Sequence, residues 1–126
     1  MDERSRGGEN RLKGLALEQQ GGRYLSAHGL RMLGSNYHCR AGEIDLIMQD
    51  GDTLVFIEVR FRRSGLRGSP VETVTPAKQR KLIRCARHYL MSHRLQDAVP
   101  CRFDVLGIGP GNRMTWIRNA FSQLPV

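Results

Sequence analysis

Acidic side chains that could hold a metal ion gather in one short segment of this 126-residue chain. Residues 43–58 contain five acids and neither lysine nor arginine: Glu43, Asp45, Asp50, Asp52 and Glu58. Asp45 and Glu58 are expected on one face of a β-hairpin, roughly 7–8 Å apart between backbones. In proteins Mg²⁺ takes one or two such carboxylates, with water and substrate phosphate as its other ligands. The pattern therefore predicts that Asp45 and Glu58 bind Mg²⁺ or Mn²⁺.

Two positive side chains are expected beside these acids. Arg60 is two residues beyond Glu58 and points to the same face, and Lys78 is expected at the sheet-facing start of a helix, where phosphate is favoured. A metal ion with a fixed positive charge beside it is the minimum set of groups for phosphodiester hydrolysis. The alternative is an exposed hairpin face that only forms ion pairs. Three large apolar side chains on that face favour a covered cleft instead.

The distribution of positive charge indicates a polyanionic partner. The chain carries a net charge of +8, whereas ten basic residues and one acid between Arg60 and Arg94 give +9 in that segment alone. This layout predicts DNA binding, although heparin-like or acidic protein partners fit it as well. The candidates for phosphate contacts, which fix position without reading sequence, are Arg62, Arg63, Arg67, Arg80, Arg84 and Arg87.

A β-hairpin must position the carboxylates. Two runs rich in β-branched and aromatic residues flank Asp50-Gly51, a strong signal for a two-residue turn. This turn would pair Asp45 with Phe56, so that Asp45 and Glu58 lie diagonally across the two strands. One face of the hairpin is then entirely apolar, with Ile44, Leu46, Met48, Val55, Ile57, Val59 and Phe61.

The rest of the chain predicts a single domain over residues 12–126, after a disordered lead-in over residues 1–11. A helix is expected over residues 12–28, a strand over 30–38 and a loop over 63–74 that could close as a lid. Thr75-Pro76 predicts the start of a second helix. Strands are expected over residues 101–108 and from residue 114, the latter leading into a short terminal helix.

Several classes of protein are excluded by what the sequence lacks. No run approaches the ~18 apolar residues of a membrane span, and the first residues are unlike a signal peptide, so we expect a cytoplasmic protein without a membrane partner. The cysteines, Cys39, Cys85 and Cys101, are odd in number and form no C-x-x-C pair. We therefore expect reduced packing residues and neither a disulfide scaffold nor a zinc ribbon.

From Lys13 to Phe121 the motifs KGLALE, GEIDLI, VFIEVRFR, AKQRKL, RFDV and NAF resemble, in order and spacing, the YraN-like family of predicted endonucleases. That family is related to the PD-(D/E)xK nuclease superfamily and is most similar to archaeal Holliday-junction resolvases. The resemblance implies a restriction-endonuclease-like α/β fold, with a central mixed sheet of four or five strands flanked by helices. By analogy, Asp45 and Glu58 would bind Mg²⁺, Glu18 would complete or support the metal site, and a homodimer is implied.

Arg60 departs from the superfamily pattern, which has a lysine at this position. Arginine stays charged and cannot act as a general base, but it can orient water and stabilise developing charge, and Lys78 is the candidate to replace part of the lost role. The expected function is Mg²⁺-dependent cleavage of DNA, with branched or repair intermediates as candidate substrates. Two alternatives stay open: a DNA-binding module with little or no cleavage, and a non-enzymatic domain that recruits an acidic protein.

Overall fold

The structure is a computed structural model that describes residues 3–61 and 70–122, with only the backbone described for residues 3–12 and 71. Its helices and strands are α1 (Glu3–Ala27), β1 (Arg31–Cys39), β2 (Gly42–Asp50), β3 (Thr53–Phe61), α2 (Pro76–Ser92), β4 (Cys101–Ile108) and β5 (Met114–Phe121). Short 3₁₀ turns, η1 (Pro70–Thr73) and η2 (Pro110–Asn112), precede α2 and β5.

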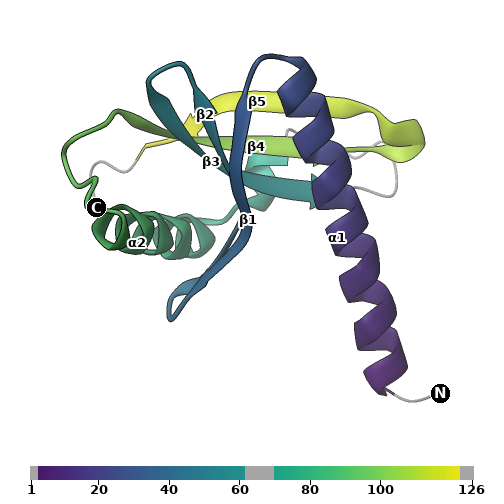
Figure 1. The fold of residues 1–126 in the computed structure, drawn as a ribbon. Helices are drawn as coiled ribbons and strands as arrows, with labels where there is room; N and C mark the ends of the chain where they lie inside the picture. The colour runs from purple at the N-terminus through teal and green to yellow at the C-terminus, as the bar shows by residue number, and fades with distance from the viewer. Residues whose placement is uncertain (1–2, 62–69, 123–126) are drawn as a thin grey trace.

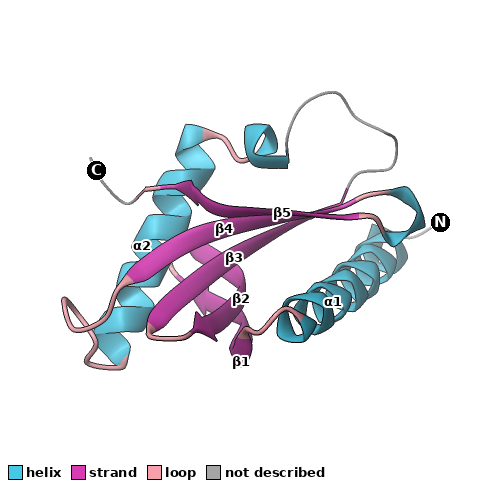
Figure 2. Cartoon of the chain, turned by 90° about the horizontal axis from the view of Figure 1, so that it is seen from above, coloured by secondary structure: helices cyan, strands magenta, loops and turns pink. Residues whose placement is uncertain are grey.

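The five strands form one sheet in the order β1-β2-β3-β4-β5, with α1 and α2 packed on its opposite faces (Figures 1 and 2). β3 and β4 are parallel, and the other neighbouring strands are antiparallel. The parallel pair requires a crossover, which α2 supplies. The predicted mixed sheet flanked by helices is confirmed, and it is compatible with a restriction-endonuclease-like fold.

The first helix is longer than predicted. α1 begins at Glu3 and not at residue 12, so residues 3–11, expected to be a disordered lead-in, are helical. Once a helix has formed, each further residue adds one backbone hydrogen bond without the cost of a new nucleus. The composition of residues 1–11 taken alone does not show this effect. Gly21 and Gly22, which weaken helix propensity, lie where α1 meets the sheet: a Cβ at Gly21 would lie 2.8 Å from Leu106 Cδ2. The helix ends before Gly29, whose φ is +100°.

The β2–β3 hairpin is confirmed, but its register differs from the prediction by two residues. Asp50 pairs with Thr53, so the two loop residues are Gly51 and Asp52, and Gly51 has a φ of +59°. The expected sorting of side chains between faces survives, because a two-residue shift preserves the period of two. Ile44 is the exception, since it packs in the core under α2.

The corrected register changes the geometry expected for the acids. The regular pairs end at Leu46 opposite Ile57, so Asp45 and Glu58 are the next residues of the two strands. Continued by one residue, this register places Asp45 opposite Glu58, and not in the diagonal position that the sequence predicted. At the same level of β1, Asn36 lies between the paired residues Ser35 and Tyr37 and has a φ of +52°.

Of the later elements, α2 and β4 follow the prediction and β5 differs from it. The Thr75 hydroxyl accepts a hydrogen bond from the Lys78 N–H at 3.2 Å and caps α2, as expected. β4 has the predicted bounds, whereas β5 is a strand throughout Met114–Phe121 and contains no part of the expected terminal helix. Most of the predicted lid loop, residues 62–69, lies outside the described residues.

No helix in the described part of the chain is long and apolar enough to cross a membrane.

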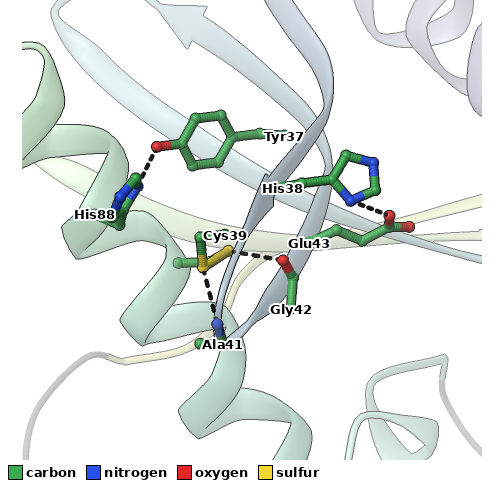
Figure 3. Close-up of a disulfide and its surroundings, with 8 residues drawn as sticks. Tyr37, His38, Cys39, Ala41, Gly42, Glu43 and His88 are labelled. Carbon is green, nitrogen blue, oxygen red and sulfur yellow. Dashed lines mark hydrogen bonds and ion pairs between the residues drawn. A yellow bond between two sulfur atoms is a disulfide. The ribbon is translucent and has the colours of Figure 1, made fainter.

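The cysteines were predicted wrongly. Cys39, at the end of β1, and Cys85, in α2, form a disulfide with their Cα atoms 5.9 Å apart (Figure 3). The two residues are 46 positions apart, and only the packing of α2 against β1 and β2 brings them together. Cys101 is the free cysteine and is half-buried.

Candidate metal and active site

Four acidic side chains from three elements surround one end of the β2–β3 hairpin. α1 supplies Glu18, β2 supplies Glu43 and Asp45, and β3 supplies Glu58. Carboxylate oxygens of Glu18, Glu43 and Asp45 all lie within 4.8 Å of one another. Beside them is a cleft of about 330 Å³, lined by Gly14, Leu15, Glu18, Asn36, His38 and Glu43. The structure thus brings Glu18, predicted only through the family resemblance, to Asp45 and Glu43, whereas Glu58 lies outside this group of three.

Asp45 is anchored at the bottom of this group. It is 8% exposed, and its Oδ2 accepts a hydrogen bond from the Val59 N–H at 2.8 Å, across the hairpin. Burial raises its pKa, although the Val59 hydrogen bond acts in the opposite direction. A buried acid with a fixed orientation and a penalty for its charge is suited to bind a cation.

Glu58 lies between this acidic group and two cations. Its Oε1 is 3.5 Å from Arg60 Nε and 3.9 Å from Lys78 Nζ. Glu58 is 6% exposed, and its Oε2 has no hydrogen-bond partner among the described residues. Burial, and then the charge of Asp45, raise the pKa of Glu58 to about 7, against the opposing effect of Lys78 and Arg60.

Glu18 lies against the acids of the hairpin. Burial is again the first cause that raises its pKa to about 7, followed by the charge of Asp45 and a hydrogen bond with the Asp45 side chain. The Asn36 side chain hydrogen-bonds to Glu18 and acts in the opposite direction. Glu18 Oε2 is buried without a hydrogen-bond partner in the described part of the structure.

The donor set fits a hard divalent cation. Buried carboxylate oxygens almost always have hydrogen-bond donors, and Glu18 Oε2 and Glu58 Oε2 have none among the described residues. Mg²⁺ and Mn²⁺ prefer oxygen ligands of this kind. A bound cation would also favour the charged carboxylates, whose pKa values burial now raises.

The predicted cations fall into three groups. Arg60 and Lys78 are half-buried beside Glu58, where the sequence placed them. Exposed positions on α2 are occupied by Arg80, Arg84 and Arg87. The remaining predicted phosphate contacts lie outside the described residues: Arg62, Arg63 and Arg67.

Glu43 is a member of the acidic group that sequence reasoning did not assign to the site. It was noted only as one of the acids of residues 43–58. It is half-buried, and its Oε2 is 3.2 Å from His38 Nδ1 of β1 (Figure 3). Period-two alternation puts Glu43 on the Asp45 face, which was the available signal.

Asp104 is a second buried acid that the sequence did not single out, and its role is structural. It is fully buried, and its carboxylate accepts hydrogen bonds from Arg102 Nε at 3.0 Å, Trp116 Nε1 at 2.9 Å and the Asn119 N–H at 2.9 Å. Arg102 also donates to Asp50 at 2.8 Å. Because its oxygens are satisfied, Asp104 is not a candidate metal ligand.

Comparisons with known proteins agree with one another on the family. The model of the uncharacterised protein family UPF0102 matches residues 17–108. A UPF0102 protein of Chromohalobacter salexigens is 53% identical over 116 residues, which cover 90% of this chain and 93% of that protein. A UPF0102 protein of Nitrosococcus oceani is also 53% identical over 116 residues, covering 89% and 93%.

A solved structure was also matched. The structure of Pyrococcus furiosus SfsA in complex with Ca²⁺ aligns with 86% of this chain and 63% of its own, at 14% sequence identity. Its TM-score of 0.34 is too low for the match to bear on the fold or the site of this chain.

Proposed function

The chain belongs to the uncharacterised protein family UPF0102, and we propose that its acidic cleft is the active site of an Mg²⁺-dependent endonuclease that hydrolyses DNA. The observation that carries the proposal is the state of Glu58. It is a carboxylate more than nine-tenths buried, next to Asp45, with one oxygen lacking a hydrogen-bond partner among the described residues. A buried carboxylate oxygen without a partner costs stability unless a hydrogen-bond donor or a cation binds it.

In this proposal Asp45 and Glu58 hold the metal ion, and Glu18 and Glu43 complete or support its site. Mg²⁺ or Mn²⁺ bound there would neutralise phosphate charge and lower the pKa of a water molecule. Asp45 is held in place by the Val59 N–H, so its carboxylate needs little reorganisation to bind.

Arg60 and Lys78 act on the charge of the substrate. As an arginine, Arg60 stabilises negative charge on the phosphate and cannot act as a general base toward water. Lys78 lies in the first turn of α2, where the helix dipole adds to its positive charge. Together they orient a phosphate beside Glu58 and stabilise the extra charge that develops as water attacks phosphorus.

DNA is the proposed substrate because of the chain's charge. A net charge of +8 and the exposed arginines of α2 support contacts with phosphates. Branched DNA and repair intermediates are the proposed targets through the resemblance to junction resolvases. A homodimer is part of the same proposal, since cutting two strands suits two-fold symmetry.

Arg60 favours one specific alternative, a DNA-binding module with weak or no cleavage. The superfamily's lysine can lose a proton and arginine cannot. The Arg60→Lys variant distinguishes the two functions. If the wild type is inactive and this variant cleaves DNA, the wild-type protein is the DNA-binding module.

Cleavage of a labelled panel tests the proposal: a four-way junction, a flap, a duplex and a single strand. Each is incubated with Mg²⁺, Mn²⁺ or EDTA. We expect metal-dependent products with the wild type and none with Glu58→Gln. Glu72→Gln, the same change at an exposed residue of η1, is the matched control and should cut as the wild type does. Metal-independent cutting, or cutting retained by Glu58→Gln, would refute the proposed site.

A further inference from the structure

The Cys39–Cys85 disulfide fastens the turn between β1 and β2 to α2 (Figure 3). Cys39 pairs with Gly42 across this turn, and its sulfur accepts a hydrogen bond from the Ala41 N–H at 3.3 Å. The Cys85 sulfur lies 3.3 Å from the Gly42 carbonyl oxygen. Both sulfurs therefore contact the turn backbone immediately before Glu43.

Other contacts between β1 and α2 do not hold this turn. The Tyr37 hydroxyl hydrogen-bonds with the His88 ring (Figure 3). The Tyr37 ring also packs edge-on against Tyr89, with 5.3 Å between the ring centroids. These contacts end two residues before Cys39. On the far side, Gly42 lies beside Lys81 and the Cys85 sulfur of α2, and the disulfide is the covalent link between this turn and α2.

We propose that this disulfide is a redox-reversible clamp on the metal site, opened by a dithiol and closed when a cyclic disulfide oxidises the two cysteines and is itself reduced to the dithiol. The inference rests on the proposed function, because the clamped turn leads directly into Glu43. It also connects the two sides of the site: α2 carries Lys78, whose Nζ is 3.9 Å from Glu58, and Cys85 two turns further on. Opening the clamp releases the strand end that brings Glu43 to Glu18 and Asp45.

The two sulfurs differ in access, which determines how the clamp opens. Cys85 is fully buried, whereas Cys39 is half-buried. A thiolate of the dithiol attacks the Cys39 sulfur, the S–S bond breaks, and Cys85 leaves as a thiolate that takes up a proton. The second thiol then displaces Cys39 from the mixed disulfide. The dithiol ends as a cyclic disulfide, and both cysteines end as thiols.

Thiol counting in a Cys101→Ser background, which removes the free cysteine, tests the bridge itself. After treatment with oxidised dithiothreitol, denaturation and alkylation, the protein should carry no alkyl group. Protein reduced with dithiothreitol should carry two. Two alkyl groups in both preparations would overturn the clamp.

Limited trypsin digestion tests whether the bridge holds the turn. Arg40 is an exposed residue of the turn, and Arg113 is an exposed residue just before β5 that serves as the matched control. Reduction should accelerate cutting after Arg40 and leave cutting after Arg113 unchanged. Equal rates at Arg40 in both redox states would overturn the proposal.

Mn²⁺ titration calorimetry tests the coupling to the metal site, with reductant removed by anaerobic gel filtration. Reduction should weaken Mn²⁺ binding about tenfold, as loss of groups that orient metal ligands does. The Cys39→Ser variant should bind like reduced protein in both conditions. Equal binding in the two redox states overturns the coupling alone. If neither the oxidised nor the reduced protein binds Mn²⁺, the proposed metal site and the coupling are both overturned. Thiol counting and trypsin digestion then still decide whether the disulfide holds the turn.

Discussion

At Glu58, burial and a neighbouring negative charge act on the pKa against two neighbouring positive charges. Burial and the charge of Asp45 raise its pKa, and Lys78 and Arg60 lower it, with a result of about 7. Two cations at 3.9 and 3.5 Å therefore do not compensate for the water that this carboxylate has lost. A cation in contact with the unpartnered oxygen would supply the missing stabilisation.

The metal-free protein should lose stability as the pH rises from about 4.5 to about 7. Glu18 and Glu58 have folded-state pKa values of about 7, above the ordinary value of 4.5, so the folded state binds more protons in this window. The stability that these protons contribute is fully present below pH 4.5 and is lost as the pH passes through the folded-state pKa. Urea unfolding at a series of pH values, with EDTA present, measures the slope.

Two glutamine variants serve as controls for this pH dependence. Glu58→Gln removes one of the two groups and should have a shallower slope than the wild type. Glu72→Gln changes an exposed acid and should have the wild-type slope. A wild-type free energy of unfolding that rises between pH 4.5 and 7 would contradict the assignment of raised pKa values to Glu18 and Glu58.

Among the elements, β4 and β5 are joined by a buried carboxylate as well as by their backbone ladder. Asp104→Ala should lower the free energy of unfolding by about 3 kcal/mol, because Arg102 and Trp116 lose their buried acceptor. Mn²⁺ affinity should not change, since Asp104 is not among the acids of the cleft. Urea unfolding and calorimetry measure the two quantities. Asp52→Ala, in an exposed turn, is the control, and equal losses in both variants would refute the structural role.

The glycines of α1 should respond in opposite ways to alanine. A Cβ at Gly14 meets nothing within 4 Å, so Gly14→Ala should stabilise the protein by about 0.5–1 kcal/mol through helix propensity. A Cβ at Gly21 would lie 2.8 Å from Leu106 Cδ2, and Leu106 is fully buried, so Gly21→Ala should destabilise by about 1 kcal/mol. Thermal unfolding compares them. Stabilisation by both variants would show that α1 does not pack closely on β4.

Local sequence patterns predicted most helices and strands and the two faces of the β2–β3 hairpin. The features that the sequence did not predict depend on packing between segments far apart in the chain. Strict alternation sorted the β2–β3 hairpin between its faces, and Thr75 marked the start of α2. The hairpin register was out of reach because Asp50-Gly51 and Gly51-Asp52 both place Gly51 in the loop. The pairing of Cys39 with Cys85 depends on how α2 packs against the β1–β2 turn, and no local spacing reports that.

At the scale of the molecule, the candidate site and the arginines of α2 carry opposite charge. Glu18 and Glu43 line a cleft formed by α1, β1 and β2, and Arg80, Arg84 and Arg87 occupy exposed positions on α2. In the absence of metal the acids of the cleft repel phosphate, while α2 attracts it. The proposed function therefore requires that α2 recruit DNA and that a cation permit a phosphate to approach Glu58.

The salt dependence of DNA binding tests this division directly. Each phosphate contact contributes about 0.9 to the slope of log K against log salt concentration, so a variant with Arg80, Arg84 and Arg87 all changed to glutamine should lose about 2.7 from the magnitude of that slope. Fluorescence anisotropy with a labelled duplex, in EDTA to prevent cleavage, measures it. Arg113→Gln removes an exposed arginine outside α2 and should leave the slope nearly unchanged. If the triple variant keeps the wild-type slope, the outer face of α2 does not bind DNA, and its arginines are left for the acidic protein partner that the charge pattern also allows.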